Sequence, residues 1–135
     1  MNRFFSIYAL TFRRPAAAFS RLLEGNHFAS GFGYMLITTL LYTLMYIFLN
    51  QAGGAPSTFT PWLNIPKENY YFYNQFLLAP SMFLAWFTAA SFIQVISHAS
   101  GGTGRFEETL AATGLAISVS MWGTLPHDLV MSFSS

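Results

Sequence analysis

The chain has 135 residues and a formal net charge of +1, with 8% charged residues, 53% hydrophobic residues and a mean hydropathy of +0.42. Soluble domains contain about 25% charged residues, so this composition argues against a water-soluble domain and for a membrane protein. The absence of cysteine excludes disulfides, thiolate catalysis and cysteine-based metal sites.

The first 24 residues mix aromatic and leucine side chains with four arginines. Arg14-Pro15 interrupts this segment, because the residue before a proline avoids the helical region, so we expect two short amphipathic helices at the interface. Arg13, Arg14 and Arg21 would anchor them there. Ordinary anchoring is the simpler role, and binding of anionic lipid is the alternative. This segment lacks a signal-peptide pattern, so we expect it to be retained.

Lys, Arg, Asp and Glu are absent from residues 25–66, 69–104 and 109–127, which predicts transmembrane helices at about residues 28–49, 73–97 and 110–129. Each span reaches the roughly 20 residues that cross about 30 Å of hydrocarbon. The predicted fold class is all-α: a polytopic bundle with three spans, forming a single membrane domain over residues 1–135. Four of the six basic residues precede the first span, which places the N-terminus in the cytoplasm.

A turn-rich connection leads into the second span at Tyr70, Tyr71 and Tyr73. Tyrosine is enriched where a span leaves the bilayer, because its ring is apolar and its hydroxyl polar. These residues are therefore predicted interface anchors. An aromatic platform for a substrate is the sharper alternative, although an aromatic belt explains the position without a ligand.

Within the second span, Pro80 removes a backbone hydrogen bond and predicts a helix kink. Gln75 and Gln94 could bond to neighbouring helices or line a polar path for a transported solute. Transporters usually keep an ionisable group inside the membrane, and the three predicted spans contain none away from their ends. Transport is thus the second choice.

The predicted inner turn contains Gly101, Gly102 and Gly104, followed by Glu107 and Glu108. Glycines of this kind end one helix and turn into the next, whose first turn favours carboxylates. A phosphate-binding loop would need Lys followed by Ser or Thr after its last glycine, and a dinucleotide fingerprint needs a further glycine and a preceding strand. Neither is present, so the turn is predicted to be structural.

Small residues recur every four positions in the third span. Small side chains let helix backbones approach closely in a bilayer, so this stripe predicts helix packing. The partner could be another span of this chain, which we favour, or a second chain. Gly114 and Ser118 form a second small patch. The stripe consists of Ala112, Ala116, Ser120 and Thr124.

Residues suited to catalysis are sparse. His127-Asp128 has the letters of a metal-dependent hydrolase dyad, but that chemistry needs further ligands at the same site. A second set at the inner membrane face has no metal-motif spacing, and its glutamates have a simpler role at a helix start. We therefore predict no enzyme activity, metal or cofactor. That inner set is Glu24, His27, His98, Glu107 and Glu108.

The chain resembles the Yip1-domain family of integral membrane proteins. The likeness rests on Arg14-Pro15 with Phe19 and Leu22-Leu23, on the inner turn Gly-Gly-Thr-Gly-Arg-Phe-Glu-Glu-Thr-Leu, and on a small-residue third span that reaches Pro126. The resemblance implies a cytoplasmic N-terminus and five membrane helices, of which this chain would supply the first three. We therefore expect a domain that is incomplete at its C-terminal end, and of the bacterial rather than the trafficking type.

The leading interpretation is a non-enzymatic membrane protein that acts through helix-helix contacts in membrane organisation, trafficking or scaffolding. The alternative is a small transporter or channel subunit, and a membrane enzyme using the inner His and Glu residues comes third. The expected partners are the lipid bilayer and other membrane helices or a second copy, without nucleic acid. The expected location is the bacterial cytoplasmic membrane.

Overall fold

The structure, a computed structural model, describes residues 2–54 and 66–133 and is all-helical in that part of the chain. This confirms the all-α class. The two short N-terminal helices and the three long helices were predicted from sequence, and each long helix extends beyond its predicted span at both ends. The elements are α1 (Arg3–Thr11), α2 (Pro15–Leu22), α3 (His27–Gln51), the 3-10 turn η1 (Lys67–Asn69), α4 (Tyr70–Ala99) and α5 (Phe106–Phe133).

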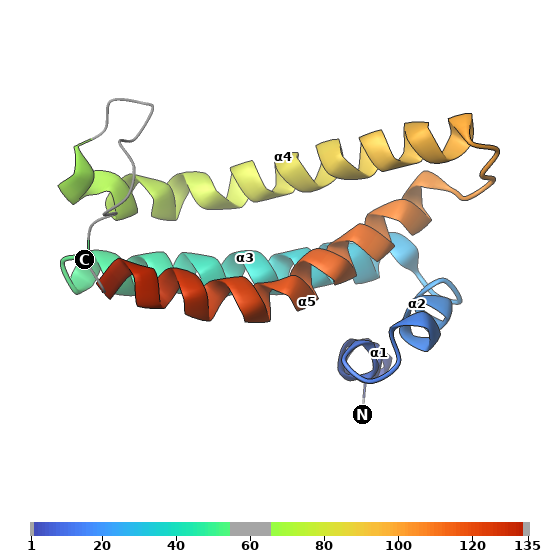
Figure 1. The fold of residues 1–135 in the computed structure, drawn as a ribbon, viewed down its shortest axis with the longest axis horizontal. Helices are drawn as coiled ribbons and strands as arrows, with labels where there is room; N and C mark the ends of the chain where they lie inside the picture. The colour runs from blue at the N-terminus through green and yellow to red at the C-terminus, as the bar shows by residue number, and fades with distance from the viewer. Residues whose placement is uncertain (1, 55–65, 134–135) are drawn as a thin grey trace.

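The three long helices lie alongside one another, and α1 and α2 sit near the end where α3 and α5 begin (Figure 1). Helices α3 and α5 run in the same direction, whereas α4 runs in the opposite one. Helix α1 is seen end-on in this view, so it lies crosswise to the long helices. Among the described residues, two helices are long and apolar enough to cross a membrane, His27–Gln51 and Lys67–Ala99.

Local sequence signals set the helix boundaries near the N-terminus. The Asn2 side chain accepts a hydrogen bond from the Phe4 N–H, and the Asn26 side chain accepts one from the Ala29 N–H. Such caps satisfy donors that a helix start leaves free. Pro15 occupies the first turn of α2, where a missing N–H costs nothing. The predicted break at Arg14-Pro15 is therefore confirmed.

The turn between α4 and α5 is held by backbone bonds typical of a glycine-ended helix. Gly101 has φ of +88°, its N–H bonds the His98 carbonyl at 3.0 Å, and the Gly102 N–H bonds the Ser97 carbonyl at 2.8 Å. At the start of α5, the Glu108 carboxylate accepts from the Arg105 N–H at 3.0 Å. The glycines thus end α4 and lead the chain into α5, in the geometry that the sequence predicts.

Helices α3 and α5 touch backbone to backbone. A Cβ atom added at Gly114 would lie 2.9 Å from the Gly31 carbonyl oxygen, and one added at Gly31 would lie 2.9 Å from the Ala111 Cα. Ala111, Leu115 and Ser118 on the same face of α5 are fully buried. Small residues therefore let these two helices approach as closely as their backbones permit.

Most of the predicted packing stripe on α5 lies outside the buried contact with α3, although Thr124 reaches Tyr42 of α3. Ala116, Ser120 and Thr124 are exposed, and Ala112 is half-buried. A strict four-residue repeat drifts around the helix by about 40° per step, because the helix has 3.6 residues per turn. The seam observed here alternates steps of three and four, which holds it on one face. The residues of this seam are Ala111, Gly114, Ser118 and Met121.

We predict that Gly114→Ala destabilises the protein, because its methyl group would push into the Gly31 backbone. Gly123→Ala is the matched control on the same helix, since a Cβ there meets nothing within 4 Å. Removing an exposed helical glycine should instead raise stability, by up to about 1 kcal/mol. Thermal unfolding in a mild detergent measures both. Shifts of the same sign in the two variants would contradict the close contact.

Candidate functional site

Aromatic side chains hold the helices together, because their polar atoms form hydrogen bonds to neighbouring helices. Trp86 of α4 is fully buried, and its indole N–H donates to the Leu110 carbonyl and the Thr113 hydroxyl of α5, both at 3.1 Å. A buried tryptophan needs such a partner, because an unpaired N–H would cost free energy. Trp86 therefore fixes α4 on α5 in one register.

A second set of aromatic hydrogen bonds joins α1 to the long helices. The Tyr8 hydroxyl donates to the Ser118 carbonyl at 3.0 Å and accepts from the Trp122 indole at 2.6 Å. The Tyr34 hydroxyl donates to the Phe4 carbonyl at 2.9 Å, and these two rings stack with centroids 4.2 Å apart. Helix α1 is thus attached to both α3 and α5. This attachment was not predicted from the sequence.

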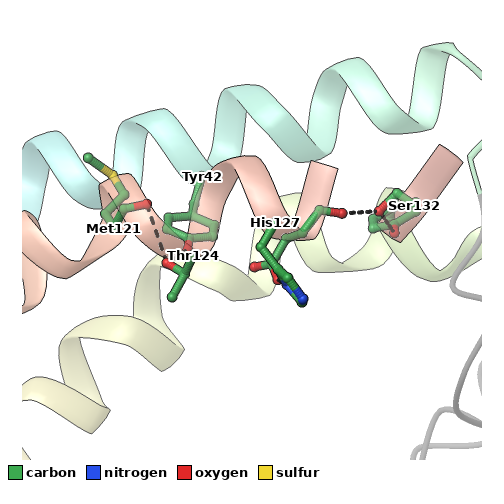
Figure 2. A network of polar contacts seen from close by, with 7 residues as sticks. Tyr42, Met121, Thr124, His127 and Ser132 are labelled. Atoms are coloured by element: carbon green, nitrogen blue, oxygen red, sulfur yellow. Dashed lines mark hydrogen bonds and ion pairs between the residues drawn. The ribbon is translucent and has the colours of Figure 1, made fainter. Parts of the chain in front are cut away.

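A polar network lies near the far end of α3 and α5 (Figure 2). The hydroxyls of Tyr42 and Thr124 are 2.5 Å apart, and the Thr124 hydroxyl lies 3.4 Å from the Met121 carbonyl. One helical turn or more further along, the Ser132 hydroxyl donates to the Asp128 carbonyl at 2.8 Å. The contact between Tyr42 and Thr124 joins α3 to α5 without a charged group, whereas the other two bonds lie within α5.

The His127-Asp128 pair lies on the exposed surface of α5. The His127 Nδ1 lies 3.4 Å from the Asp128 carboxylate, with side chains 71% and 49% exposed, and His127 points away from α3 in Figure 2. Within residues 2–54 and 66–133, no group of three or more His, Asp or Glu side chains could hold a metal ion. The pair marks an exposed part of α5.

The inner His and Glu residues are each engaged separately. The His27 ring lies 2.6 Å from the Leu23 carbonyl, and the His98 ring lies 3.1 Å from the Gly104 carbonyl. Glu107 forms an exposed ion pair with Arg105 at 2.9 Å. The structure thus gives these side chains roles in helix ends and turns.

Polar residues of α4 form hydrogen bonds within the helix and to the inner turn. Gln94 donates to the Gly104 carbonyl at 2.6 Å, and its side-chain oxygen accepts from the Thr109 hydroxyl, so it clamps the inner turn. Thr88 bonds back to the carbonyl four residues earlier in its own helix. Gln75 is half-buried, and α4 continues through Pro80, which is exposed. The kink predicted at Pro80 stays a prediction.

The predicted interface anchors differ in their positions. Tyr73 is 46% exposed, as an anchor should be, but Tyr71 is only 5% exposed and packs against Met45 and Leu49. The Tyr71 hydroxyl lies 2.8 Å from that of Ser132. Tyr71 is therefore a packing residue that joins α4 to α5, and its assignment as an anchor was wrong. Tyr70 is half-buried.

The predicted arginine anchors all lie on the surface. Arg13, Arg14 and Arg21 are exposed, around the turn between α1 and α2 and in the last turn of α2. Helices α1 and α2 lie near the end where α3 and α5 begin (Figure 1).

The chain was compared with protein-family models, with curated proteins and with solved structures, and nothing matches in any of the three. The function is therefore inferred from the geometry described above. That geometry consists of helix contacts, hydroxyl pairs and an exposed apolar surface.

We predict that Tyr71→Phe lowers the free energy of unfolding by about 1 kcal/mol, through loss of one buried hydrogen bond. Tyr73→Phe, on the exposed side of the same helix, should leave it unchanged. Thermal or denaturant unfolding in detergent provides the comparison. An equal effect of both substitutions would argue against the Tyr71 to Ser132 bond.

A second prediction separates the two small-residue faces of α5. Ser118→Leu should destabilise the fold by about 1–3 kcal/mol, since Ser118 is fully buried. The double variant Ala116→Leu with Ser120→Leu should keep the wild-type unfolding midpoint, because both sites are exposed. If the double variant unfolds like Ser118→Leu, the stripe packs after all.

Proposed function

We propose that this chain is a multi-pass membrane protein in which α3, α4 and α5 cross the bilayer. The observation that carries the proposal is the surface of α4, in which only Tyr71, Trp86 and Ala90 are buried out of 30 residues. Soluble monomers rarely expose large continuous apolar patches, so lipid is the solvent that fits this helix. Its most exposed apolar side chains, at 66–69%, are Phe76, Leu84, Phe92 and Val95.

The distribution of charge supports spans for all three helices and a cytoplasmic N-terminus. Helices α3 and α4 contain no Lys, Arg, Asp or Glu, and α5 has none from 109 to 127. Five of the six basic residues precede α3 or lie in the turn before α5, and the sixth, Lys67, precedes α4. By the positive-inside rule, the N-terminus and the α4 to α5 turn face the cytoplasm.

The crosswise position of α1 fits a helix lying in the membrane plane. It contacts α3 near Gly33 and Tyr34, about 10 Å along α3 from its first residue at 1.5 Å per residue. Interfacial helices bury their apolar face about 5–10 Å into the headgroup boundary. Exposed Phe5 and Phe12 would then face acyl chains.

Within this topology, the protein acts through helix-helix contacts as a non-enzymatic membrane scaffold of the Yip1 type, in the bacterial cytoplasmic membrane. The support comes from three long helices joined by side-chain hydrogen bonds, which present apolar faces to lipid or to partner helices. The transporter alternative has less support, because both polar atoms of the Gln94 side chain are hydrogen-bonded at the inner turn and do not face a solute path. The exposed Ala116 and Ser120 are available to a second chain.

Single cysteines test the topology without background, because the chain has none of its own. Thr103→Cys lies in the inner turn, Ala52→Cys follows α3 at the other end, and Leu84→Cys lies within α4. We expect a membrane-impermeant maleimide to label Ala52→Cys from outside intact cells and Thr103→Cys only in inverted vesicles.

Leu84→Cys is the control for burial in lipid and should be labelled only after detergent is added. Labelling of Thr103→Cys and Ala52→Cys from the same side would overturn the three-span topology. Extraction of the protein by alkaline carbonate would overturn membrane insertion itself.

A further inference from the structure

An open groove of about 580 Å³ lies between α1 and α5. Its lining includes three aromatic side chains, Tyr8 and Phe12 of the N-terminal arm and Trp122 of α5. Ala9 and Arg13 also line it. The groove therefore combines an apolar floor with a single cationic group.

Arg13 differs from Arg3, which also lines a cavity, in the partners of its guanidinium. Arg3 lines a smaller cavity of about 220 Å³, but its guanidinium donates to the Arg21 carbonyl at 2.6 Å and lies 4.0 Å from the Glu24 carboxylate. The Arg13 guanidinium makes no hydrogen bond or ion pair with the described residues. A charged donor with no partner is free to bind an anion.

We propose that this groove binds one anionic phospholipid, whose phosphate pairs with Arg13 while an acyl chain lies along Trp122. The proposal rests on the proposed function, because it needs α1 at the level of the lipid headgroups. Guanidinium binds phosphate through paired hydrogen bonds, and aromatic rings with a polar edge suit the boundary between headgroups and acyl chains. A free phosphate would leave the apolar floor uncovered.

Hydrogen bonds among the groove's own residues favour one defined site over diffuse attraction to a charged surface. Trp122 and Tyr8 are held together by a 2.6 Å hydrogen bond, and Tyr8 is tied to the α5 backbone at Ser118. The floor is thus formed before a lipid arrives, and little ordering cost accompanies binding.

Native mass spectrometry of the detergent-purified protein tests the site by titration with phosphatidylglycerol or with phosphatidylcholine of the same acyl chains. We expect one phosphatidylglycerol to bind about tenfold more tightly than phosphatidylcholine, the effect of one charge-assisted contact. Arg13→Gln should remove this preference. Arg14→Gln is the matched control, because it removes the same charge from the next residue, which does not line the groove.

A second variant tests the groove without changing charge. Ala9→Phe fills it at an exposed position and should reduce binding of both lipids about tenfold, while the unfolding midpoint stays at the wild-type value. Equal losses for Arg13→Gln and Arg14→Gln, or unchanged binding by Ala9→Phe, would overturn the site. If the protein resists alkaline carbonate but does not discriminate between lipids, only the lipid site fails; if carbonate extracts it, the proposed function fails as well.

Discussion

The backbone contact between Gly31 and Gly114 determines where every other helix of this protein can lie. It lets the backbones of α3 and α5 touch, and side chains of α1 and α4 then form hydrogen bonds to these two helices. Trp86 bonds to the α5 backbone next to this contact, and Tyr8 bonds to it one turn further on. A side chain at either glycine would displace α5, and with α5 both acceptors. The contact therefore sets the register of α4 as well as the position of α1.

The helices could be predicted because their signals are local. Long uncharged segments, Pro15 at a helix start and Gly101 at a helix end each act on neighbouring residues. The packing face of α5 could not be chosen in this way, since the chain offers two small-residue patterns and only the partner helix distinguishes them. The prediction that Tyr71 is exposed at a membrane boundary was wrong for the same reason. Its aromatic neighbours suggest such a boundary, but its burial depends on Met45 and Leu49 of another helix.

Hydroxyl and amide groups in the long helices are used to join helices and to close turns. Gln94 closes the inner turn, Tyr42 meets Thr124, and Tyr71 meets Ser132. Such pairs suit a low-dielectric surrounding, where an unpaired polar group is costly and a charge more so. The groove beside Arg13 could not be predicted either, because Trp122 lies more than 100 positions further along the sequence. No pattern within one segment connects them.

The parallel course of α3 and α5 has a consequence for biosynthesis. On the proposed topology, α3 enters the bilayer first, and its glycine face can find α5 only after α4 has crossed back and the inner turn has formed. The contact joins residues about 80 positions apart, so it forms late, after the locally determined helices. Until then the Gly31 face of α3 is open to other helices in the membrane. On this topology, that open period ends once α4 and the inner turn have brought α5 beside α3.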